Sequence, residues 1–312
     1  MTAEMWYVGD VKITRIVELG KNVRTPDFVF RNLSQEDVKR QTWLQPHFAT
    51  DDGRLISSNH AFVLECGTRR IIVDTCLGND KLRKIALWNQ RQGSFIEDLG
   101  AAGYPVDSID TILCTHLHVD HVGWNTRLVG GRWIPTFPRA QYLFGRTEWD
   151  HWSREKSDQL DGDVTPHVAN NVLEARACYD DSVRPIVEAG LHRLVESDEA
   201  ITDEISLFPT PGHTPGHVSV SIVSRGEQAI ITGDMMHHPI QCAMPEVSSN
   251  FDYDIAKALA TRADFLKRNS NKPVLILGTH FCAPTAGWIV PHEETWRFLA
   301  YEPQEMKQSV AT

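Results

Sequence analysis

No run of apolar residues in this sequence approaches the roughly 20 positions that a membrane-spanning helix requires. The first ten residues also lack the basic segment and apolar stretch of a secretory leader. None of the six cysteines lies in a C-x-x-C pair, and their spacing shows no disulfide framework. These absences are typical of a cytoplasmic protein with buried, reduced thiols, and we expect no membrane partner.

Basic residues are also scarce, because 31 Lys and Arg stand against 41 Asp and Glu, for a formal net charge of −10. Proteins that bind nucleic acid usually present a basic face, so we expect no nucleic-acid partner. The motif Gly-x-Ser-x-Gly is absent, which argues against a hydrolase with a nucleophile elbow. Hydrophobic residues make up 41% of the chain, and no linker interrupts it, which predicts a single globular domain over residues 1–312.

Short apolar runs that end at Gly, Asp or Asn recur along the chain and predict strands. The predicted strands cover residues 11–19, 61–66, 70–74, 111–115, 140–144, 205–208, 218–223, 229–232 and 274–277. Helices are predicted over residues 94–102, 168–178, 254–267 and 293–301. Two groups of strands with helices between and after them favour a mixed α/β sandwich.

Two segments are predicted to be additions to this core. One is an N-terminal extension over residues 1–60, and the other is an insertion over residues 124–191. The insertion contains four of the nine tryptophans, at positions 124, 133, 149 and 152. Their rings could form the wall of an apolar substrate pocket, or they could simply pack the insertion onto the core.

A cluster of metal-binding side chains follows the strand predicted over residues 111–115. It reads His116-Leu117-His118-Val119-Asp120-His121. Positions two apart point the same way in an extended segment, so His116 and His118 can bind one ion. Asp120 and His121 follow where the chain turns, and they can reach a second ion. Imidazole and carboxylate groups suit zinc and its neighbours, and burying them together without a metal would be unfavourable.

Three more polar residues lie near strand ends later in the chain. His213 lies in the turn Pro-Gly-His-Thr-Pro-Gly-His over residues 211–217, just before a predicted strand. Asp234 follows the apolar run 229–232, and His280 follows the run 274–277. Ends of buried strands are a common place for a site built on a sheet, so these residues extend the predicted metal site.

In the order of these motifs over residues 74–280, the chain resembles the metallo-β-lactamase fold superfamily of metal hydrolases. This resemblance implies a four-layer αββα sandwich and two divalent metal ions, expected to be zinc. It also implies three groups of ligands: His116, His118 and His213 for the first ion, Asp120, His121 and His280 for the second, and Asp234 bridging both. A hydroxide bridging the ions would be the nucleophile.

The resemblance also suggests roles for residues around the ligands. Asp74 matches an aspartate that supports the site from behind the ligands, or it simply ends a strand. His217 could support the site or stabilise its own turn. Asp120 is placed to accept a proton from the water and return it later.

The bridging Asp234 favours the hydrolases of esters, lactones, thioesters or phosphoesters within this fold. The sequence most resembles the N-acyl homoserine lactonases and the methyl parathion hydrolase-like enzymes, the latter through residues 137–140 and 148–152. The lactonases have a tyrosine three residues after the bridging aspartate, whereas this chain has His237. His237 could donate a hydrogen bond to the substrate carbonyl, or His237 and His238 could be polar rim residues.

We therefore expect a dinuclear metal hydrolase that cleaves a lactone or carboxylic ester of a small, partly apolar substrate. The same site could instead cleave an organophosphate triester or a β-lactam. A non-catalytic metal-binding or redox module is the alternative of another class. The aromatic residues of the two added segments make a homodimer an open alternative to a monomer.

Overall fold

The strands of this protein form two large sheets and one small one. The computed structural model describes residues 4–154 and 176–301. Its seven-stranded sheet has the order β1 (Met5–Val8), β2 (Val11–Arg24), β3 (Leu55–Cys66), β4 (Arg69–Val73), β5 (Thr111–Leu113), β8 (Gln141–Gly145) and β9 (His192–Val195). The six-stranded sheet has the order β10 (Ile205–Pro209), β11 (Val218–Ser224), β12 (Glu227–Ile231), β13 (Val274–Leu277), β14 (Ala286–His292) and β15 (Thr295–Ala300). The hairpin of β6 (Thr126–Val129) and β7 (Arg132–Pro135) stands apart.

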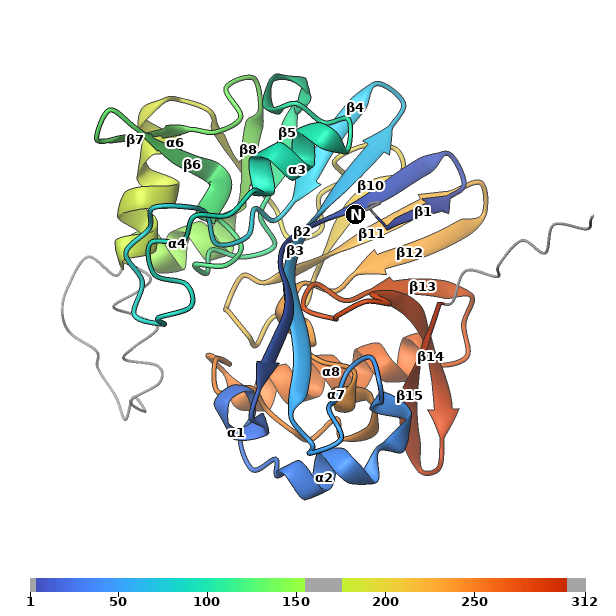
Figure 1. Ribbon diagram of the computed structural model, residues 1–312. Helices are drawn as coiled ribbons and strands as arrows, with labels where there is room; N and C mark the ends of the chain where they lie inside the picture. Colours follow the sequence, from blue (N-terminus) through green and yellow to red (C-terminus); the bar gives the residue numbers. More distant parts are fainter. Residues whose placement is uncertain (1–3, 155–175, 302–312) are drawn as a thin grey trace, which may run out of the picture.

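The helices lie beside the two sheets (Figure 1). Those near the seven-stranded sheet are α3 (Phe95–Ala101), α4 (Arg146–Arg154) and α6 (Arg184–Glu188). Those near the six-stranded sheet are α1 (Pro26–Val29), α2 (Gln35–Arg40), α7 (Ile240–Ala243) and α8 (Ile255–Asn269).

Three buried apolar layers separate four layers of secondary structure. Ile71 and Val73 of β4 pack between the two sheets, while Ile72 between them in sequence packs against α3. In β12, Ile231 likewise faces the first sheet and Ile230 faces α7 and α8. Strands buried on both faces read as continuous apolar runs, which is why the sequence shows them so clearly. The predicted αββα sandwich is confirmed.

The predicted helix over residues 293–301 is wrong. The segment is the strand β15, which pairs antiparallel with β14 across a turn in which Glu293 has φ +50°. Trp296 and Phe298, two positions apart, both pack into the layer beneath the second sheet, which is the period of a strand. The predicted helix over 254–267 is confirmed as α8, and Asp254 caps its first turn. Of the helix predicted over 168–178, only residues 176–178 lie within the described residues, and they are helical.

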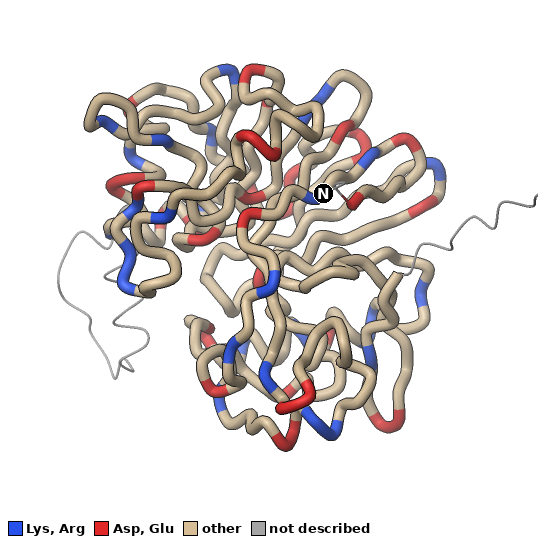
Figure 2. The backbone as a smooth tube through the Cα atoms, in the orientation of Figure 1, with Lys and Arg blue, Asp and Glu red and all other residues tan. Residues whose placement is uncertain are grey.

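The extension and the insertion both contribute to the layers, and their definition as additions stays a prediction. In the extension, β1 and β2 complete the first sheet, while Phe30 and Phe48 pack beneath the second. In the insertion, Trp149 stacks on Phe144 of β8. Acidic and basic residues are interspersed over both halves of the molecule (Figure 2). No helix within residues 4–154 and 176–301 has the length and apolar character to cross a membrane.

Candidate metal centre

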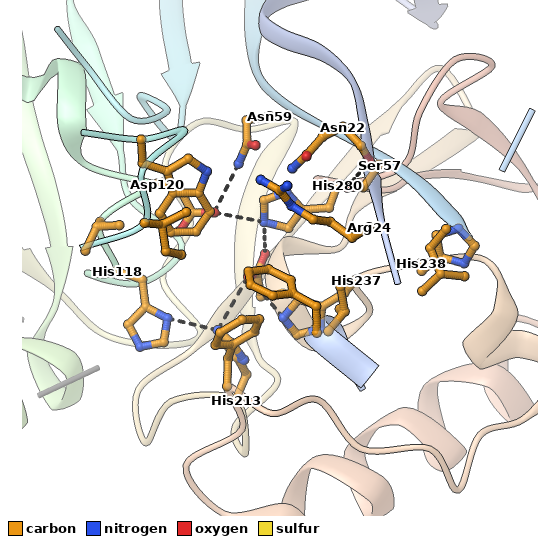
Figure 3. Close-up of a pocket in the computed structure, with 18 residues that line it drawn as sticks. Asn22, Arg24, Ser57, Asn59, His118, Asp120, His213, His237, His238 and His280 are labelled. Atoms are coloured by element: carbon orange, nitrogen blue, oxygen red, sulfur yellow. Dashed lines mark hydrogen bonds and ion pairs between the residues drawn. The ribbon is translucent and has the colours of Figure 1, made fainter. Parts of the chain in front are cut away.

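The polar loops that the sequence singled out converge at one edge of the sandwich. β4 and β5 run parallel, as do β12 and β13, so the loops that follow these strands emerge on the same side. The loop after β5 carries residues 116–121, the one after β12 carries Asp234 and the one after β13 carries His280. His213 joins them from the turn between β10 and β11 (Figure 3).

The first predicted group of ligands lies close together. One nitrogen each of His116, His118 and His213 falls within 4.8 Å of the others. The Nε2 atom of His213 is 3.0 Å from Nδ1 of His118. His116 and His213 are buried and His118 is partly buried, so an ion held here would be largely shielded from solvent.

The second group is arranged in the same way. Asp120, His121 and His280 also place one ligand atom each within 4.8 Å of one another. Nε2 of His280 is 3.5 Å from Oδ2 of Asp120, and Nε2 of His121 is 3.6 Å from Oδ1. This group faces the pocket through Asp120 and His280.

Asp234 lies between the two groups. Its Oδ2 atom is 3.4 Å from Nε2 of His213 and 3.4 Å from Nε2 of His121. Its Oδ1 atom is 3.2 Å from Nε2 of His280. One carboxylate therefore reaches a member of each group, as a bridging ligand must.

The hydrogen bonds around these side chains fit metal ligands. Nε2 of His116, Nε2 of His121 and Oδ1 of Asp234 are buried without a hydrogen-bond partner among the described residues. The opposite ring nitrogens are held: Nδ1 of His121 by Asp74 at 2.9 Å, and Nδ1 of His280 by the Ser58 carbonyl at 3.1 Å. Metal-binding histidines are usually oriented in this way through the nitrogen that does not bind the metal.

The charges of the site point the same way. Burial and the neighbouring His121 lower the pKa of His116 well below its usual value, which leaves a neutral imidazole able to bind a cation. Burial opposes protonation of His280 too, but the nearby Asp234 and Asp120 carboxylates outweigh it and raise the pKa of His280 to about 9. The carboxylates thus create a negative potential that divalent cations would neutralise.

The two predicted supporting residues contact the ligands. Asp74 accepts hydrogen bonds from His121 Nδ1 and from the Thr115 backbone at 2.8 Å, which holds the start of the ligand loop. His217 accepts a hydrogen bond from the Asp234 backbone at 2.8 Å, while its Nδ1 is 2.8 Å from the Thr210 hydroxyl. Burial lowers the pKa of His217 to about 3, so it stays neutral and keeps this arrangement. His217 therefore both stabilises its turn and positions Asp234.

The adjacent histidines 237 and 238 have different surroundings. His237 is only 6% exposed, lines the pocket and places Nε2 3.3 Å from Oδ2 of Asp234. His238 is held by protein groups, because its Nε2 donates to the Phe48 carbonyl at 2.8 Å and its Nδ1 accepts from the Ile240 backbone. The structure thus places His237 beside the predicted ligands. His238 lines the pocket as well, but protein groups hold both of its ring nitrogens.

Three residues that contact the site were not predicted as site residues from the sequence. Asp252 lies 3.2 Å from Nδ1 of His213, and Asn59 donates to Asp120 at 3.1 Å. Glu148 is buried and accepts from the backbone of Leu117 at 3.2 Å and of Gly216 at 2.9 Å, so one carboxylate holds both loops that carry the first group. Glu148 lies in the segment 148–152 that resembles the methyl parathion hydrolase-like enzymes, which was the one signal available for it.

A pocket opens directly onto these ligands (Figure 3). Its apolar lining comes from both the extension and the core, through Phe28, Ile85, Trp88, Val119 and Phe251. Trp152 of the insertion contacts His118, with ring centroids 5.6 Å apart, and donates to Glu148. Trp124, Trp149 and Trp152 all pack in the apolar layer beside the first sheet. Of these three tryptophans of the insertion, Trp152 is the one that contacts a predicted ligand.

The sequence profile of the metallo-beta-lactamase superfamily matches residues 56–280, a span that includes every predicted ligand. The chain belongs to this superfamily. It is therefore a metal-dependent hydrolase. The solved structures similar to this chain include members of the superfamily, which confirms the metallo-β-lactamase fold.

Relatives of this superfamily member include an N-acyl homoserine lactonase of Bacillus thuringiensis, 22% identical over 233 residues that cover 70% of this chain and 79% of that protein. Among solved structures, the hydrolase AbOPH of the beta lactamase superfamily superposes with a TM-score of 0.79 at 23% identity, covering 97% of this chain and 99% of that one. AidC, a dizinc quorum-quenching lactonase in complex with a product, has a TM-score of 0.79 at 17% identity, covering 97% and 98%.

Proposed function

We propose that this protein hydrolyses a lactone or carboxylic ester of a small, partly apolar molecule at a site that holds two divalent ions, zinc in the first instance. The position of Asp234 carries this proposal, because one carboxylate reaches ligands of both groups. The dizinc lactonase AidC and the lactonase of Bacillus thuringiensis support the substrate class.

Two ions bound here would lower the pKa of a water molecule between them and polarise the oxygen that gains charge in the reaction. His116, His118 and His213 would hold one ion and Asp120, His121 and His280 the other, with Asp234 shared. Four nitrogen or carboxylate ligands at each position suit zinc, although cellular supply also decides which metal is bound.

The side chain of Asp120 is suited to move the proton. It lines the pocket, and Asn59 donates to its Oδ2 atom at 3.1 Å, which fixes the orientation of the carboxylate. We infer that Asp120 accepts the proton of the attacking water and gives it to the leaving oxygen. The products are then a carboxylic acid and an alcohol, or one hydroxy acid when the substrate is a lactone.

His237 is suited to bind the substrate oxygen. It occupies the position at which the homoserine lactonases have a tyrosine, it is buried, and it lines the pocket. We infer that its ring donates a hydrogen bond to the carbonyl oxygen of the substrate. A phosphoryl oxygen could accept the same bond, so an organophosphate triester is the second candidate. A small-molecule substrate and a cytoplasmic location complete the proposal, and the six buried free cysteines support a reducing compartment.

The test combines elemental analysis of the purified protein with a panel of a lactone, an aryl ester, an organophosphate triester and a β-lactam. We expect about two metal ions per chain and turnover of the lactone or ester. Two ions with turnover of only the triester or the β-lactam would show that the site is correct but that the proposed substrate class is wrong. Full activity with one ion or none would contradict the shared role of Asp234.

A further inference from the structure

The pocket has one polar wall, made by a single pair of strands. Asn22 and Arg24 of β2 line it, and so do Ser57 and Asn59 of β3. The register pairs Asn22 with Ser57 and Arg24 with Leu55, and alternate residues of a strand share a face, so these side chains project together into the pocket. Figure 3 shows Asn22, Arg24, Ser57 and Asn59 at the pocket with Asp120 and His280.

Arg24 brings a positive charge to this wall that has no counter-charge among the described residues. No carboxylate of that part of the chain lies within ion-pair distance of its guanidinium. Its Nε atom is shielded from solvent and has no hydrogen-bond partner within residues 4–154 and 176–301. The guanidinium instead lies over the ring of Phe28, with Cζ 5.2 Å from the ring centroid, an arrangement that orients the charge without neutralising it.

The rest of the pocket does not supply the missing negative charge. The acidic side chains among its described lining residues are Asp120 and Asp234, which belong to the two groups of metal ligands. The lining also has an apolar part, through Ile85, Trp88 and Phe251. A molecule that fills this pocket therefore meets a cation away from the reacting bond and an apolar surface along its length.

We propose that Arg24 selects substrates that carry a carboxylate, or a similar anion, on the part of the molecule remote from the bond that is cleaved. This inference rests on the proposed function and names its substrate class more closely. Arg24 pairs with Leu55, four positions along β3 from Asn59, which contacts Asp120. At about 3.3 Å per residue the backbones of the two positions are roughly 13 Å apart along the strand. The long side chain of Arg24 spans part of this distance, so the experiment varies the length of the spacer between the anion and the ester.

The experiment compares two series of 4-nitrophenyl esters on the metal-loaded protein. One series consists of half-esters of straight-chain dicarboxylic acids with roughly three to eight methylene groups, bracketing the strand distance. The other replaces the remote carboxylate with a neutral amide. We expect kcat/KM to favour the half-ester about tenfold or more at the best length, since a hydrogen bond to a charged group is stronger than a neutral one.

Arg24→Met should reduce this preference to near one, chiefly through KM, and Arg24→Lys should keep part of it. The matched control is Arg225→Met, which removes an exposed arginine that pairs with Asp10. This variant should show the same preference for the half-ester as the wild type. A wild type without the preference, or equal losses on both series in Arg24→Met, would overturn the inference.

A binding measurement separates this inference from the proposed function. Calorimetry on the metal-loaded protein would use methyl ketones in place of the esters, with either a remote carboxylate or a remote amide. Tighter binding of the carboxylate in the wild type but not in Arg24→Met would support the anion site even if no ester were cleaved. If esters are cleaved but Arg24→Met changes neither the kinetic preference nor the binding preference for the carboxylate, the proposed function would stand and the anion site would be refuted.

Discussion

Replacing Glu148 with Gln should weaken metal binding, although Glu148 is in neither group of ligands. The buried carboxylate accepts from Leu117 on the loop of His116 and His118, and from Gly216 on the loop of His213. The amide of Gln keeps one acceptor but turns an NH2 group toward the other backbone N–H. This loses one hydrogen bond to a charged group, about 1.5–3 kcal/mol, and leaves a buried donor unpaired, about 1–3 kcal/mol.

We therefore expect Glu148→Gln to lower the free energy of unfolding by about 3 kcal/mol. We also expect metal affinity to fall about 10- to 100-fold, as for other residues that position ligands. Urea unfolding followed by tryptophan fluorescence and titration with a competing chelator measure the two quantities. The control is Glu196→Gln, an exposed glutamate that pairs with Arg146, which should change stability by less than about 0.5 kcal/mol. A Glu148→Gln variant that binds metal as tightly as the wild type would refute the positioning role, whatever its stability.

Three further predictions test other parts of the molecule. Asp234→Ala should lose much of the bound metal and nearly all turnover, and an active variant with its full metal content would contradict the shared ligand. His237→Phe should keep its metal, by elemental analysis, but cleave esters or lactones more slowly; unchanged kinetics would leave His237 a packing role. Burial lowers the pKa of Lys81 from 10.5 to about 8, so the unfolded chain binds more protons than the folded one between these values. Stability should therefore rise with pH across this window, by at most about 3 kcal/mol, and chemical unfolding of Lys81→Met should show a flatter pH dependence.

Much of the fold could be predicted because its central strands are apolar on both faces. The run Ile71-Ile72-Val73 must be buried whichever way its side chains point, and it is. The helix predicted over residues 293–301 was wrong because the apolar-polar pattern of a segment as short as the six residues of β15 fits a helix end as well as a strand. Its pairing with β14 decided the matter, and pairing is a tertiary contact that the local sequence does not encode.

The convergence of the candidate ligands was predictable where they are close in sequence or follow a strand. His116 to His121 occupy six positions, and their spacing alone suggested two groups. The roles of Asp252 and Glu148 were not predictable from local spacing, because they contact residues 39 and 31 positions away, respectively. Buried acidic residues are uncommon, but burial itself is a property of the fold, so these partners became visible only with the structure.

The two groups of ligands each combine residues from distant parts of the chain. His121 and His280 are separated by 280 − 121 = 159 positions and come from loops of different sheets. An ion held by both would cross-link the two sheets and close a very long loop, which restricts the unfolded chain as a covalent cross-link does. Removal of the ion would remove this cross-link, so the metal-free protein should unfold at a lower concentration of denaturant than the metal-loaded protein.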